Sequence, residues 1–158
     1  MDNNKKVMIA SVALRMSLGW FMLFDGILNA LNPQFTAAKF LAGAKTFPGF
    51  YAWFATPANL AWVDPFNLAA IILIGIALFF GVFIRPAAWC GVLMMIIYYF
   101  PHYAFPVVPH GYIVEDHFIY AVIFAFSALS PAAQQFALGN VLRAKTFLGQ
   151  VPLVGKYI

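Results

Sequence analysis

Long apolar runs dominate this chain and alternate with short segments that contain proline and charged residues. The first run covers residues 7–31, and Asn32-Pro33 ends it because proline lacks a backbone donor and restricts the residue before it. Further runs cover 66–84, 86–101 and 113–129, with Asp64-Pro65 as a helix start and Arg85-Pro86 as a tight turn. Since about 20 apolar residues cross a bilayer, the pattern predicts four transmembrane helices.

Two other segments do not fit a membrane crossing. Residues 32–65 are rich in aromatic side chains and proline, and we expect short interfacial helices over 36–45 and 49–55, or a lid that caps the bundle. Ser130-Pro131 then begins a stretch over 131–147 whose apolar residues fall on one helical face. That spacing predicts a C-terminal amphipathic helix on the membrane surface.

Composition supports the same class of protein. The chain has 158 residues, of which 64% are hydrophobic and 9% are charged, whereas soluble domains carry about 25% charged residues. We therefore expect a single membrane domain over 1–158: an all-α integral membrane protein built as a four-transmembrane-helix bundle. The net charge of +4 is scattered beside membrane segments, so lipid headgroups are the expected partner and nucleic acid is not.

The basic residues also predict an orientation. With four crossings, both termini share one side of the membrane. That side holds Lys5, Lys6, Arg85, Arg143, Lys145 and Lys156, and the other side holds Lys39 and Lys45. The positive-inside rule then places both termini in the cytoplasm of a multi-pass protein in the cell membrane.

Two charged residues in the first apolar run are the first candidates for function. Arg15 and Asp25 each cost about 3 kcal/mol or more within a membrane, so each must face protein, water or a ligand. They lie ten residues apart, about 15 Å along a helix, and cannot pair with each other. They are interpreted either as interhelical ties, with Arg15 free to reach the interface, or as part of a site for a polar or anionic headgroup.

A second cluster of polar residues lies at the predicted outer end of the third and fourth runs. It contains His102, Tyr103, His110, Tyr112, Glu115, Asp116, His117 and Tyr120. Histidine can hydrogen-bond a quinone carbonyl or relay its proton, which favours a quinone or proton site near Asp25. A polar rim with a helix cap at Glu115-Asp116 is the alternative, and the spacings match no metal motif.

The candidate residues have separate expected roles. We expect Asp25, His102 and His117 to be catalytic, and Arg15, His110, Asp116 and Tyr120 to contact a bound quinone. Cys90 is the sole cysteine, so no internal disulfide can form, and no motif for covalent haem is present. Any electron chemistry would then need a bound cofactor, a quinone or a partner subunit.

Three motifs give the chain a family resemblance. They are Leu14-Arg15-x-x-x-Gly19-Trp20-Phe21-x-x-x-Asp25-Gly26, the spacing Gly75, Gly81 and Arg85, and Glu115-Asp116-His117-x-x-Tyr120-Ala121. In order and spacing they resemble the DoxX/DoxD family across most of 14–130. The resemblance implies a four-helix membrane protein, similar to the small membrane subunit of thiosulfate:quinone oxidoreductase, that works with other redox subunits.

The chain departs from that family pattern at two positions. Asn29 stands where a lysine is common, and Asn67 stands where an acidic residue often opens the second helix. Both departures argue against carrying thiosulfate chemistry over to this chain. The leading hypothesis is a membrane subunit of a quinone-linked oxidoreductase or respiratory assembly, in a hetero-complex or homo-oligomer. The alternatives are an assembly subunit without chemistry and a small transporter.

Overall fold

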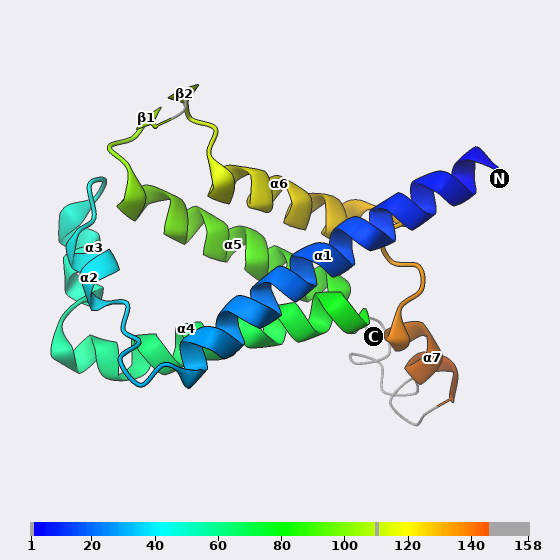
Figure 1. The fold of residues 1–158 in the computed structure, drawn as a ribbon, viewed down its shortest axis with the longest axis horizontal. Coiled ribbons are helices and arrows are strands. Elements are labelled where there is room, and N and C mark those ends of the chain that lie inside the picture. The colour runs from blue at the N-terminus through cyan, green and yellow to red at the C-terminus, as the bar shows by residue number, and fades with distance from the viewer. Residues whose placement is uncertain (1, 110, 146–158) are drawn as a thin grey trace.

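The computed structural model describes residues 2–109 and 111–145, and the chain is mostly helical over this part. Figure 1 shows long helices that run back and forth, with small elements gathered at the end far from the N-terminus. The elements are α1 (Asn3–Leu31), α2 (Ala38–Ala42), α3 (Pro48–Phe54), α4 (Pro57–Phe80), α5 (Ile84–His102), β1 (Val107–Val108), β2 (Gly111–Tyr112), α6 (Asp116–Leu129) and α7 (Leu138–Lys145).

The first pair of packed helices is α1 with α4, which approach each other backbone to backbone. A Cβ added at Gly19 would lie 2.5 Å from the backbone nitrogen of Phe79, and one added at Gly75 would lie 2.5 Å from that of Leu23. Small residues at helix interfaces allow such close packing in membranes. Glycine on both helices therefore fixes how tightly α1 and α4 pack.

The second pair is α5 with α6. The ring of Phe124 is fully buried and packs directly against Gly91. A Cβ added at Gly91 would lie only 2.4 Å from Cε1 of that ring. Leu78 and Ala88 are also fully buried, and they belong to the same apolar core as Phe124. This core joins the two helix pairs at the end of the molecule near the α4–α5 turn.

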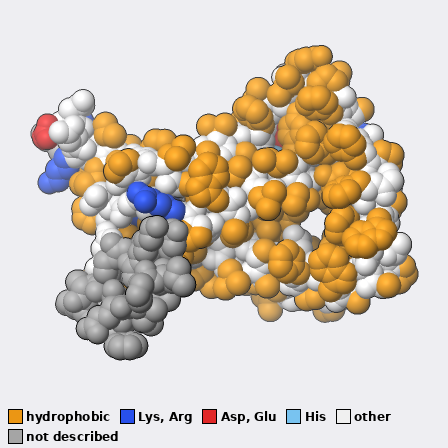
Figure 2. Space-filling view, turned by 180° about the vertical axis from the view of Figure 1, so that it is seen from behind, with side chains coloured by type: hydrophobic (Ala, Val, Ile, Leu, Met, Phe, Trp, Pro, Cys, Tyr) orange, Lys and Arg blue, Asp and Glu red, His pale blue; other side chains and the backbone are white. Residues whose placement is uncertain are grey.

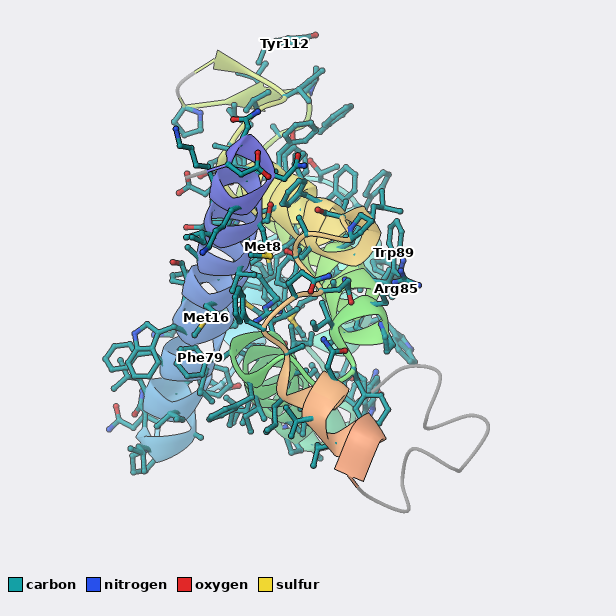
Figure 3. The ribbon with its side chains drawn as sticks, turned by 90° about the vertical axis from the view of Figure 1, so that its right-hand side faces the viewer. Met8, Met16, Phe79, Arg85, Trp89 and Tyr112 are labelled. Carbon is teal, nitrogen blue, oxygen red and sulfur yellow. The ribbon has the colours of Figure 1, made fainter. Side chains whose placement is uncertain are left out.

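Within the described residues, three helices are long and apolar enough to cross a membrane, namely α1, α4 and α5. The fourth predicted crossing is α6, an apolar helix of 14 residues. Large apolar side chains cover much of the outer surface: Trp20 is 54% exposed and Leu73 is 63% exposed. Figure 2 shows this apolar surface over most of one face, and Figure 3 shows Arg85 and Trp89 projecting outward from α5. A surface this apolar identifies a membrane protein.

The predicted start of the second crossing is wrong. Helix α4 begins at Pro57, where a missing backbone donor does no harm, and it continues through Pro65. The carboxylate of Asp64 caps no helix; its Oδ1 accepts the backbone N–H of Ala37 at 3.0 Å. Asp64 therefore connects the segment after α1 to α4.

The predicted turn at Arg85-Pro86 is also wrong. The chain turns at residues 81–83, where Gly81 (φ +73°) ends α4 in the left-handed conformation that favours glycine. Arg85 and Pro86 lie in the first turn of α5, where proline is tolerated because that turn has no internal acceptors for its N–H groups.

The predicted C-terminal helix over 131–147 is wrong in its first half, and 146–147 lie outside the described residues. Residues 131–137 form turns, and α7 begins only at Leu138. The backbone oxygens of Ala133 and Gln135 accept hydrogen bonds from Arg15. These two carbonyl groups therefore bind a side chain of α1. Tertiary contacts therefore override the helical pattern here.

The segment after α1 contains two short helices, as predicted; α2 is shorter than its predicted range, and α3 begins and ends one residue earlier than predicted. Tyr51 of α3 is buried, and its hydroxyl donates to the backbone oxygen of Ile97 on α5 at 2.8 Å. The short antiparallel pairing of β1 with β2 was not predicted, so the fold is not purely helical. These small elements close one end of the molecule (Figure 1).

Candidate functional site

A cavity of about 710 Å³ lies between the two helix pairs and beneath α2 and α3. Its volume falls in the range typical of small-molecule sites. Figure 2 shows an opening between apolar side chains on the half of the molecule away from the grey residues. The lining is mostly apolar and aromatic, so the cavity suits a ligand with a large apolar part.

The polar side chains of the lining come from one end of the helices. They are Asp25, Asn29, Thr36, Tyr51, Asn67, Tyr98, His102, His117 and Tyr120. The last turns of α1 and α5 and the first turn of α6 meet at this end because neighbouring helices run in opposite directions. The deeper wall is apolar, with Ile71, Ile74 and Met95. The cavity therefore has a polar end and an apolar end.

Two side-chain pairs organise the polar end on the α1 and α4 side. The hydroxyl of Tyr98 donates to Oδ1 of Asn67, which bridges α5 and α4. Asn29 donates from Nδ2 to Oδ2 of Asp25 at 3.1 Å, one turn apart on α1. Each pair leaves further hydrogen-bonding groups for a ligand, because an amide has two N–H donors and a carboxylate has two oxygens.

The two histidines lie on the α5 and α6 side. The ring centroids of His102 and His117 are 5.0 Å apart, and that of Tyr98 is 6.1 Å from His117. Glu115 is the N-cap of α6: its Oε1 accepts the backbone N–H of His117 at 2.9 Å, and its Oε2 lies 2.9 Å from Nδ1 of the same ring. The carboxylate therefore fixes the orientation of His117. The ring of His117 also lines a smaller apolar cavity of about 220 Å³.

Burial affects one phenol at the roof of the cavity. Burial raises the pKa of Tyr51, because the phenolate would lose its hydration. The hydroxyl of Tyr51 thus stays protonated at neutral pH and keeps its hydrogen bond to Ile97. This bond holds α3 over α5 and so keeps the roof closed on that side.

Arg15 lies away from this cavity and is fully buried, so it does not reach the interface. Its Nη1 donates to the backbone oxygens of Ala133 at 2.7 Å and Gln135 at 3.1 Å. Among the described residues, its Nε and Nη2 find no hydrogen-bond partner. Arg15 therefore ties α1 to the segment that follows α6.

The structure brings together four of the seven predicted site residues: Asp25, His102, His117 and Tyr120 all line the cavity. Asp116, expected to contact a quinone, is exposed and does not line it. The expected ligand contact of Arg15 likewise has no place in this lining. His110 lies outside the described residues.

Sequence reasoning missed two residues of the polar end, Asn67 and Tyr98. Asn67 and Tyr98 were visible as polar groups within apolar runs, a signal that marks residues facing a helix bundle's interior. Glu115 and Asp116 were both expected at the N-terminal cap of this helix, and the local sequence does not show which of the two carboxylates contacts His117. That choice depends on the backbone at the start of α6.

The described residues contain no group of three histidine, cysteine or acidic side chains arranged to hold a metal ion. The polar end offers hydrogen-bond donors and acceptors from five different elements of the fold. No family model, curated protein or solved structure matches this chain. The resemblance to the DoxX/DoxD family thus depends on the sequence motifs alone.

Proposed function

We propose that this protein binds a membrane quinone in the cavity between its helix pairs, with the ring at the polar end and the isoprenoid tail along the apolar wall. The observation that carries the proposal is the cavity itself: about 710 Å³, mostly apolar, with its polar side chains gathered at one end. A ligand with a polar ring and a long apolar tail matches that division. The cavity opens between apolar side chains of the outer surface, which suits a ligand that arrives from the bilayer (Figure 2).

The proposal includes a place in the membrane. Helices α1, α4 and α5 cross the bilayer together with α6, as a four-helix unit with both termini in the cytoplasm of the cell. This orientation puts the basic residues near the N-terminus and Arg85 on the cytoplasmic side. The polar end of the cavity then lies near the outer surface, below α2 and α3.

We further propose that the protein is a DoxX-like subunit of a quinone-linked oxidoreductase or respiratory assembly, acting with partner subunits that supply the electrons. The sequence motifs support this role. Asp25 and His117 would bind and orient the ring and exchange protons with it. In the purified complex, Asp25→Asn and His117→Ala should each lower quinone reduction at least tenfold, and unchanged turnover in both would refute the assigned roles.

Binding can be tested on the isolated protein by filling the cavity. Ala70 lines it, whereas its neighbour Ala69 is exposed on the other side of α4. Ala70→Phe should weaken the binding of a decyl-benzoquinone at least tenfold, and Ala69→Phe should leave it unchanged. Quenching of tryptophan fluorescence reports binding, because Trp62 lies in the cavity wall. Equal quenching in both variants and the original protein would place the quinone elsewhere.

A further inference from the structure

The contact between Glu115 and His117 determines which nitrogen of the imidazole carries the proton. A carboxylate only accepts hydrogen bonds, so the Nδ1 atom 2.9 Å from Oε2 of Glu115 must be the protonated one. The side chain of Glu115 is 7% exposed and is held in place by its second bond, to the backbone N–H of His117. In the neutral ring, Nε2 is therefore left with a lone pair and is a hydrogen-bond acceptor.

The neighbouring groups at the polar end are also acceptors. Nδ1 of His102 lies 3.4 Å from the backbone oxygen of Tyr98, which likewise only accepts, so Nε2 of His102 is an acceptor as well. Asp25 adds carboxylate oxygens, one of which already accepts from Asn29. The donors available beside them include the N–H groups of Asn67, whose Oδ1 is taken by Tyr98.

This set of groups distinguishes the two redox forms of a quinone. A quinone carbonyl only accepts, so it would form no hydrogen bond with the two histidine nitrogens or with Asp25. A hydroquinone hydroxyl donates to such an acceptor and still accepts from an amide N–H. We propose that the polar end of this cavity selects the hydroquinone, or a similar phenol, over the quinone, and that Glu115 is the positioning residue that sets this preference. The inference rests on the proposed function, because it assumes that the ring binds in this cavity.

The test compares a decyl-hydroquinone with the corresponding decyl-benzoquinone. Affinities are measured by titration calorimetry at pH 7.5, without oxygen and at one detergent concentration, so that both ligands partition alike into micelles. One hydrogen bond gained or lost between ligand and site changes affinity by about tenfold. We therefore expect the hydroquinone to bind the original protein about tenfold more tightly than the quinone.

Glu115→Gln provides the decisive variant. The new Oε1 can keep the bond to the backbone N–H of His117, and the amide nitrogen then replaces Oε2, the carboxylate oxygen nearer to Nδ1 (2.9 Å, against 3.1 Å for Oε1). An amide nitrogen donates, so the proton of the imidazole moves to Nε2 and turns it into a donor. The preference for hydroquinone should then vanish or reverse. Asp116→Asn is the matched control: it removes the same charge from the adjacent, exposed residue and should keep the preference.

The outcomes separate this inference from the function on which it rests. If the quinone binds the original protein as tightly as the hydroquinone or more tightly, the selection is refuted while quinone binding stands. If Glu115→Gln remains folded, by its gel-filtration profile, and keeps the original affinity ratio, Glu115 does not set the preference. If neither ligand binds, the proposed function and this inference both fail.

Discussion

The close contact of α1 with α4 makes a sharp prediction for Gly75→Ala. The added Cβ would lie 2.5 Å from the backbone nitrogen and 2.7 Å from the Cα of Leu23, whereas ordinary contacts begin at 3.4 Å. Because both atoms belong to a helix backbone, the two helices must separate by about 1 Å. Overpacking of this kind costs about 1–3 kcal/mol, and alanine returns up to about 1 kcal/mol through its higher helix propensity. We expect a net loss of about 1–2 kcal/mol.

Two other glycines provide graded controls for this variant. A Cβ on Gly49 meets nothing within 4 Å, and one on Gly26 first meets the side chains of Ile72 and Ile71, which can rotate. Thermal unfolding in detergent should therefore give Tm values that fall in the order Gly49→Ala, Gly26→Ala, Gly75→Ala. About 2–4 °C is expected per kcal/mol for a chain of this size. A Tm for Gly75→Ala equal to that of Gly49→Ala would show that α1 and α4 do not pack as described.

Three further predictions follow from buried groups. Both hydrogen bonds of Arg15 come from Nη1 at the tip of its side chain, and the lysine side chain is one bond shorter. Arg15→Lys should therefore cost about 1.5–3 kcal/mol for one lost bond to a charged group, and protease should cut 131–137 faster; a cleavage rate equal to that of the original protein would contradict this. Phe124→Ala empties the space beside Gly91 and should cost about 3–5 kcal/mol, read as a lower denaturation midpoint. The pKa of Tyr51 is raised in the folded state above its ordinary value of 10.0, so its stabilising contribution is complete below pH 10.0 and is lost as the pH rises further. The stability of Tyr51→Phe should therefore fall less steeply at alkaline pH than that of the original protein. An unchanged slope would count against the raised pKa.

The polar end of the cavity could be predicted only in part from the sequence. Asp25, His102, His117 and Tyr120 were predicted to converge because antiparallel helices bring their neighbouring ends together, and they line one cavity. Asn67 and Tyr98 were missed because their bond depends on how α4 and α5 face each other. The pairing of two polar side chains 31 residues apart is not a local property of either helix.

The sequence by itself determined the order of the long apolar helices, because the length and hydrophobicity of an apolar run are local properties of the chain. Only the tertiary structure decided where α4 begins, where the chain turns before α5, and what Arg15 binds, 118 residues away in the chain. Those outcomes depend on backbone groups that find partners in distant segments, and a buried polar group takes the partner that the packing brings to it. For the same reason, the structure alone paired Glu115 rather than Asp116 with His117.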